Sequence, residues 1–148
     1  MTYEDIAHAF PPGAPWTDPV PGCPPEIFQI ERDLRGRSWL ELTTAMCNRH
    51  SDAYHMLDLE PLAYFLPAFL RAAVSDPNGV AAESLVYFVC SGKARKARDL
   101  YLRLTGEQRD VMMGVVALLL KNGDDSFVSG ERVKFAARLR EWSARKGT

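Results

Sequence analysis

Apolar positions are densest between Pro61 and Val74, and this stretch organises the predicted fold. Its aromatic, leucine and alanine residues cover nearly the full circumference of a helix, so we expect a central helix surrounded by other elements. Asp58 is placed to cap the amino end, and Pro61 fits the first turn. Pro67 removes a backbone donor in mid-helix and therefore predicts a kink or a break near Leu66.

Apolar residues at helical spacing predict further helices on both sides of the central one. A capping-box sequence at Thr105–Gln108 marks one helix start. Residues 91–96 are expected to form a basic loop, and residues 98–104 a short helical turn or an irregular segment. The flanking helices are expected at residues 2–10, 26–34, 43–57, 79–90, 105–121 and 129–146. The chain is thus predicted to be all-α, a single compact domain over residues 1–148 with about six or seven helices around the Pro-kinked one.

Proline is concentrated near the amino end, where residues 11–25 hold 7 of the 10 prolines. Such a segment is extended, polyproline-like or turning. We expect it to form an arm that wraps the surface, with Trp16 and Val20 as anchors.

Length, composition and charge exclude several classes of protein. The 148 residues, 47% hydrophobic and 25% charged, fit one globular domain. The longest apolar run is too short to span a bilayer, and the acidic start does not resemble a signal peptide, so we expect a cytoplasmic protein. Residues 1–74 carry 5 basic and 10 acidic side chains, whereas residues 75–148 carry 13 and 9. The net charge of the whole chain is −1, which disfavours duplex nucleic acid as a ligand.

The cysteines and histidines suggest little metal chemistry. Cys23, Cys47 and Cys90 form no Cys-x-x-Cys motif, so reduced thiols are expected. Cys47 and His50 are three residues apart and form the nearest approach to a metal site. His55 falls on a different helical face, and no second ligand pair accompanies them. We expect no metal, no cofactor and no catalytic motif.

Basic residues late in the chain form a candidate surface for a protein partner, which would be acidic. The candidates are the basic residues Lys93, Arg95, Lys96, Arg98 and Arg138, together with Trp142. The helix at 129–146 is expected to be basic and amphipathic, with Phe135, Leu139 and Trp142 on one face. Self-association through that face is an alternative use of the same helix.

The order of Trp39, a His-x-x-Ala motif at His50, the run Tyr64–Leu70 and Gln108 resembles a family of small bacterial proteins of unknown function. The core of that family reads Tyr-Tyr-Leu-Pro-Ala-Phe-Leu, and Phe65 stands here in place of the second tyrosine. The resemblance covers roughly residues 28–120. It implies an α-helical bacterial domain and assigns no catalytic residue.

Two hypotheses about function follow. The first is a non-catalytic protein-binding module of the bacterial cytoplasm, such as an immunity protein or an antitoxin. The second is a small-ligand-binding protein or an enzyme whose pocket opens at the Pro67 kink, lined by His50, Tyr54 and Tyr64 together with Cys47.

Overall fold

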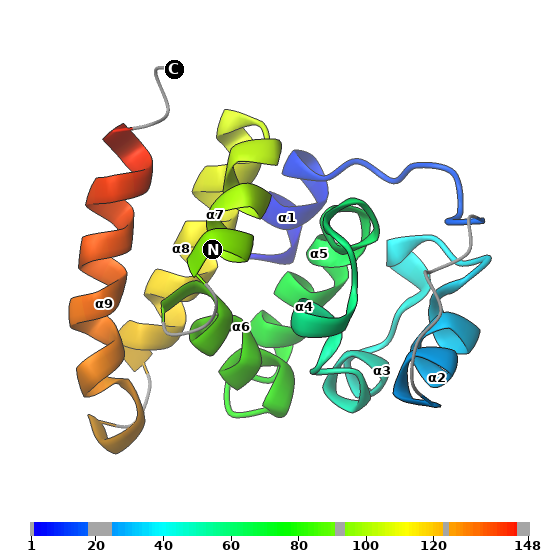
Figure 1. Cartoon of the computed structure of the whole chain (residues 1–148), viewed down its shortest axis with the longest axis horizontal. Helices are drawn as coiled ribbons and strands as arrows, with labels where there is room; N and C mark the ends of the chain where they lie inside the picture. The colour runs from blue at the N-terminus through cyan, green and yellow to red at the C-terminus, as the bar shows by residue number, and fades with distance from the viewer. Residues whose placement is uncertain (1, 18–24, 91–93, 123–124, 145–148) are drawn as a thin grey trace.

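Helices make up the secondary structure of the chain (Figure 1). The computed structural model describes residues 2–17, 25–90, 94–122 and 125–144, and the backbone alone at 25–28, 94, 125–132 and 143–144. Within these ranges there are nine α-helices, one 3₁₀ helix and no β-strand. In order they are α1 (Tyr3–Ala9), α2 (Pro25–Leu34), η1 (Trp39–Glu41), α3 (Thr44–Arg49), α4 (Ala53–Met56), α5 (Leu59–Ser75), α6 (Val80–Cys90), α7 (Ala94–Arg103), α8 (Gly106–Asn122) and α9 (Asp125–Ala144). The predicted all-α class is confirmed, with more helices than expected.

α5 is the central helix, as its all-round apolar pattern predicts. The consecutive residues Leu66, Pro67, Ala68 and Phe69 are all buried, although together they point to every side of the helix. η1, α1, α3, α6, α7 and α8 all contact α5, which occupies the middle of the molecule in Figure 1. Each fully buried large apolar side chain contributes about 1.5–3 kcal/mol, so the ten buried residues of α5 make a large contribution to stability.

Pro67 lies inside α5 without ending it. The helix runs unbroken from Leu59 to Ser75, so the break foreseen near Leu66 does not occur. A proline in a helix interior costs about 3 kcal/mol. The buried side chains on either side of Pro67 offset that cost and keep the backbone helical. The kink itself stays a prediction.

Side-chain caps fix the starts of α1 and α8. In α1, the Asp5 N–H donates to Thr2 Oγ1 at 3.4 Å and the Thr2 N–H donates to Asp5 Oδ2 at 2.8 Å. In α8, the Gln108 N–H donates to Thr105 Oγ1 at 3.2 Å and the Thr105 N–H donates to Gln108 Oε1 at 3.1 Å, which confirms the predicted capping box. Gln108 Nε2 also donates to the Ala9 carbonyl at 3.1 Å, so the same residue ties α1 to α8.

The segment predicted as one helix from residue 43 to residue 57 is two short helices. α3 ends at Arg49, and His50 leaves the helical conformation with φ −105° and ψ 39°. Ser51 and Asp52 follow, and serine and aspartate favour turns and caps over helix interiors. The chain therefore turns before α4 begins at Ala53.

Two helices begin earlier than predicted. α7 starts at Ala94, inside the stretch expected to be a loop, and continues to Arg103. Its alanine, arginine and lysine residues are strong helix formers, and Ala97 and Leu100 are buried. α9 starts at Asp125 and not at Ser129, so the expected loop is shorter.

The described part of the proline-rich arm packs on α5. Trp16 is half-buried, and its ring centroid lies 5.6 Å from that of Tyr64 and 6.4 Å from that of Phe65. The Tyr64 hydroxyl donates to the Ala14 carbonyl at 2.6 Å. Trp16 is thus confirmed as an anchor, whereas Val20, the second expected anchor, lies outside the described residues.

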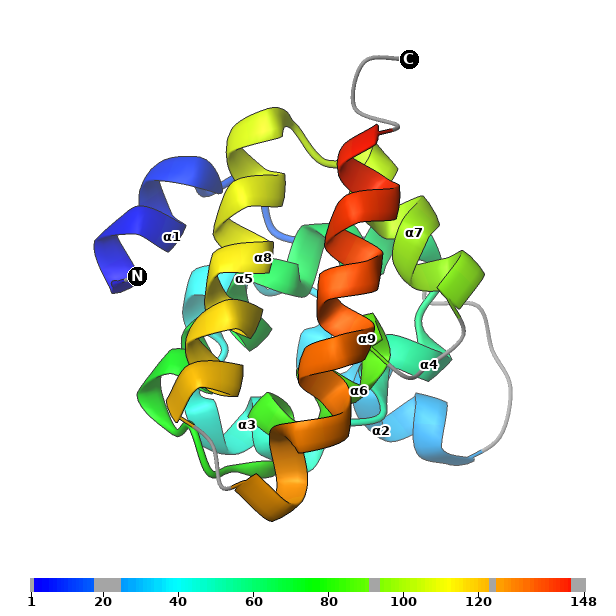
Figure 2. The same cartoon turned by 90° about the vertical axis from the view of Figure 1, so that its left-hand side faces the viewer.

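α9 packs along the outside of α6 and α8 (Figure 2). Trp142 anchors it: the indole is 1% exposed and its ring centroid lies 5.1 Å from that of Tyr101 in α7. Among the helices described, none combines the length and the apolar composition needed to cross a bilayer.

Candidate functional site

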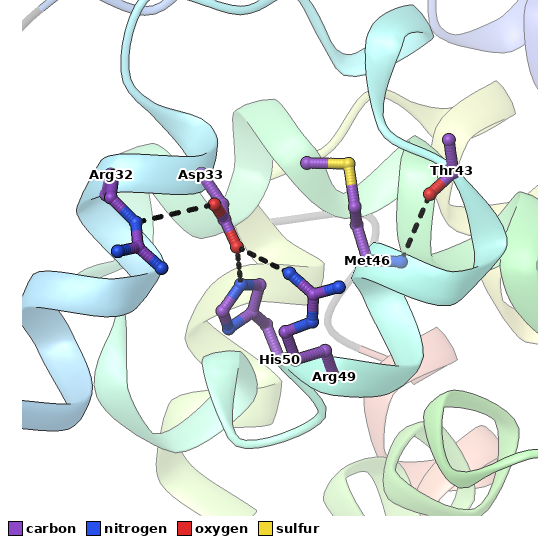
Figure 3. A network of polar contacts seen from close by, with 6 residues as sticks. All are labelled: Arg32, Asp33, Thr43, Met46, Arg49 and His50. Atoms are coloured by element: carbon purple, nitrogen blue, oxygen red, sulfur yellow. Dashed lines mark hydrogen bonds and ion pairs between the residues drawn. The ribbon is translucent and has the colours of Figure 1, made fainter.

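His50 and Asp33 form a largely buried polar contact between α2 and the end of α3. His50 is 5% exposed, and its Nε2 lies 2.5 Å from Asp33 Oδ2 at the end of α2 (Figure 3). An ionised carboxylate only accepts hydrogen bonds, so Nε2 carries the proton. Arg49 Nη1 approaches the same oxygen at 3.4 Å, and Arg32 Nε lies 3.9 Å from Oδ1.

The electrostatics of this network stabilise the carboxylate. The hydrogen bond from His50 is the main cause that lowers the pKa of Asp33 below its usual 3.8, and the positive charges of Arg32 and Arg49 add to it. The Asp33 side chain is only 15% exposed. The contact therefore fastens α2 to the end of α3 and leaves little room for a ligand.

The four residues expected to line a pocket at Pro67 do not share one environment. His50 faces Asp33, whereas Tyr54 is fully buried with its ring stacked on that of Phe88 at 5.0 Å. Burial raises the pKa of Tyr54 well above 10.0. Tyr64 points to the arm, and Pro67 is buried within α5. The structure thus places these residues against protein groups in separate parts of the core.

Cys47 is placed as a core thiol. Its Sγ donates to the Ala68 carbonyl at 3.6 Å, and burial raises its pKa to about 12, so the thiol stays protonated. The His50 ring contacts Asp33, so the two weak candidates for metal ligands, Cys47 and His50, do not act as a pair. In the described ranges no three His, Cys, Asp or Glu side chains are grouped closely enough to hold a metal ion. Cys90 is also buried, and Cys23 lies outside the described residues.

The basic candidate residues differ in their availability. Arg95 is exposed, whereas Lys96 Nζ donates to the carbonyls of His55 and Leu57 at 3.1 and 2.7 Å and so supports the end of α4. Arg98 and Arg138 are half-buried and lie 3.8 and 3.9 Å from the carboxylates of Asp99 and Glu141, respectively. Lys93 lies outside the described residues. These side chains do not form one free basic surface.

The expectation that Trp142 is a partner-binding residue is wrong. The indole is buried against Tyr101 because α9 turns its tryptophan toward α7. Phe135 is half-buried and packs on the same core, and Leu139 is 40% exposed. The face proposed for self-association is therefore largely used within the chain.

A pocket between α4 and α6 gathers polar and apolar side chains at the surface. Its volume is 390 Å³. We call it the α4–α6 pocket, and it is lined by Ser51, Asp52, His55, Val80, Glu83, Ser84, Val86 and Tyr87. Volumes of this size are typical of ligand and side-chain binding sites.

The outer face of α6 forms one wall of this pocket. Val80 and Tyr87 are 51% and 52% exposed and stand seven residues apart, so both lie on one face of the helix. Glu83 and Ser84 lie between them on the same face. We call these four residues the α6 stripe. The His55 ring from α4 meets the Tyr87 ring at a centroid distance of 6.2 Å.

Sequence reasoning did not single out this pocket. Most of the Val80–Cys90 segment is apolar and buried, so the exposed face of this helix is difficult to recognise in the sequence. The signal was the spacing of Val80, Glu83, Ser84 and Tyr87 at i, i+3, i+4 and i+7, a mixed face on an otherwise apolar helix. The contribution of Asp52 and His55 depends on the turn after α3, which the periodicity did not predict.

The chain was also compared with known proteins. No protein-family model, curated protein or solved structure matches it. The family resemblance drawn over residues 28–120 therefore stays a prediction. The α4–α6 pocket and the α6 stripe are the features of this chain that bear on its function.

Proposed function

We propose that this chain is a non-catalytic protein-binding module that contacts its partner through the α6 stripe and the α4–α6 pocket. The observation that carries the proposal is the pair Val80 and Tyr87, two large apolar side chains more than half exposed on one face beside a pocket. Single exposed apolar residues are common on any surface. Two on one helix face, next to a hollow with a polar rim, are typical of a contact surface.

The side chains of the stripe suit an interface. Tyrosine is enriched among residues that dominate binding energy, because its ring buries a large area and its hydroxyl forms hydrogen bonds. Val80 adds apolar area at the opposite end, and Glu83 and Ser84 supply polar groups between the two. A partner that covers this face also fills the pocket beside it.

The surroundings of His55 support binding rather than catalysis. Its ring meets the rings of Tyr87 and Phe88 edge-on, at centroid distances of 6.2 and 6.4 Å. Within the described ranges it has no hydrogen bond to a serine or a carboxylate. Acid–base and nucleophilic catalysis by histidine depend on such orienting contacts.

Within this proposal, the chain acts in the bacterial cytoplasm as an immunity protein or an antitoxin. Its size, its helical framework and the uneven charge of its two halves support that assignment. The partner is then encoded beside the chain, since such proteins and their targets are produced together. A neighbouring gene product is the first protein to test.

The experiment is co-expression of the tagged chain with the products of neighbouring genes, followed by affinity measurement. Tyr87→Ser and Val80→Ser should each weaken binding by about tenfold or more, the range of truncated interface anchors. Val133→Ser is the matched control, because Val133 is 73% exposed on α9 and far along the chain from the stripe. Unchanged binding by both stripe variants, or no complex at low salt, contradicts the proposal.

A further inference from the structure

We infer that the α4–α6 pocket receives an arginine side chain of the protein partner. This inference rests on the proposed function and names the group that the pocket takes. It follows from three features: the charge of the lining, the aromatic wall of the pocket, and the N–H groups at the amino end of α6, which already have acceptors within the protein.

The charged residues that line the pocket are complementary to a cation. Asp52 and Glu83 are both exposed, and the lining contains no lysine or arginine. Asp52 stands at the N-cap position of α4, yet its side chain makes no capping hydrogen bond. In the described part of the chain neither carboxylate has an ion pair or a side-chain hydrogen bond. Two carboxylates with unused acceptors therefore face the same hollow.

The aromatic wall favours a planar cation. The Tyr87 ring is half-exposed beside the pocket, and a guanidinium group stacks on such a face more readily than an ammonium group does. Its five donors in a fork also match carboxylate oxygens better than a point charge. Arginine thus uses the ring, the carboxylates and the apolar side of Val80 together, the last through its methylene stem.

An anionic ligand fits the same place poorly. The amino end of α6 lies beside the pocket, but its Ala81 N–H already donates to Asn48 Oδ1 at 3.0 Å, and its Glu83 N–H donates to the Gly79 carbonyl at 3.2 Å. α4 has only four residues and a negligible dipole. The carboxylates of Asp52 and Glu83 would repel a phosphate or a carboxylate.

The test is a nuclear magnetic resonance titration of the full chain with N-acetyl-argininamide. The matched probe is N-acetyl-citrullinamide, which has the same shape without the charge. We expect saturable shifts of the amides of residues 51–55 and 80–87 with the arginine probe, and at least about fivefold weaker binding of citrulline. Equal binding of the two probes, or no saturable shift with arginine, overturns the inference.

Variants separate this inference from the proposed function. Asp52→Asn and Glu83→Gln should each weaken the arginine probe by about two- to fivefold, as exposed ion pairs do, and Glu60→Gln should leave it unchanged. Glu60 is exposed on α5 and is not part of the pocket. If Tyr87→Ser abolishes partner binding while Asp52→Asn and Glu83→Gln have no effect on partner or probe, the arginine site is refuted and the protein-binding module remains. If the arginine probe binds but no stripe variant alters partner binding, the proposed function fails.

Discussion

Asp33 shows how one side chain can hold two helices together. Its carboxylate lies at the end of α2 and accepts from His50 at the end of α3. The sequence placed His50 on an inner helical face but gave no sign of its partner, because the two residues are 17 apart and meet only through the turn between the helices. Local periodicity contains no information on such a contact.

Asp33→Asn should lower the free energy of unfolding by about 1–2 kcal/mol near neutral pH, since a charge-assisted hydrogen bond is replaced by a neutral one. The pKa of Asp33 is lowered in the folded protein, so its stabilisation is complete above the unfolded value of 3.8 and is lost as the pH falls through the lower folded value. The difference between wild type and variant should therefore narrow below pH 3.8.

Urea unfolding between about pH 7 and about pH 2.5 measures this difference. Arg32→Ala is the control: the arginine side chain is 75% exposed and 3.9 Å from the carboxylate, so its loss should cost less than about 0.5 kcal/mol. A constant difference over the whole pH range would show that the Asp33 charge does not stabilise the fold.

Helices with an unambiguous apolar pattern could be predicted from the sequence. Helix boundaries that depend on contacts with distant residues could not. The central helix, the capping boxes and the end of α2 at Gly36, where φ is +81°, follow from local chemistry. The division between α3 and α4 falls at His50, whose ring contacts Asp33 on α2. The α4–α6 pocket depends on that division, so the proximity of residues 51–55 to residues 80–87 could not be predicted from the sequence.

Pro67→Ala should straighten α5. The substitution restores a backbone donor for the carbonyl of Ala63 and removes the ring that crowds it. Crystal structures of the parent and the variant, compared by the helix axes before and after residue 67, provide the measurement. Superposition of the two helices without any change would show that packing, and not the proline, sets the path of α5.

At the scale of the whole molecule, α9 is docked on the rest of the domain through Trp142 and Phe135 and is not a free interaction helix. Its sequence suggested a basic surface helix available to a partner, because basic residues outnumber acidic ones over residues 129–146. The position of Trp142 against Tyr101 was not visible in the pattern, since both a self-associating helix and a docked helix have one apolar face. Only tertiary contacts distinguish the two.

Trp142→Ala should lower the free energy of unfolding by about 3–5 kcal/mol, the range for removal of a buried aromatic side chain. Thermal unfolding and sedimentation of the same samples measure stability and mass together. Leu139→Ser on the same helix is the control and should cost little, because Leu139 is 40% exposed. A change in sedimenting mass with unchanged stability would instead support self-association through α9.

The bonds between α1 and α8 have a consequence for synthesis of the chain. His8 Nδ1 lies 2.6 Å from Glu107 Oε1, and Gln108 Nε2 donates to the Ala9 carbonyl, each contact joining residues 99 apart. On the ribosome, α1 and α5 emerge well before α8, which covers both of them. The side of α5 that α8 covers therefore stays exposed until the last third of the chain has been translated, so the complete core forms only late in synthesis.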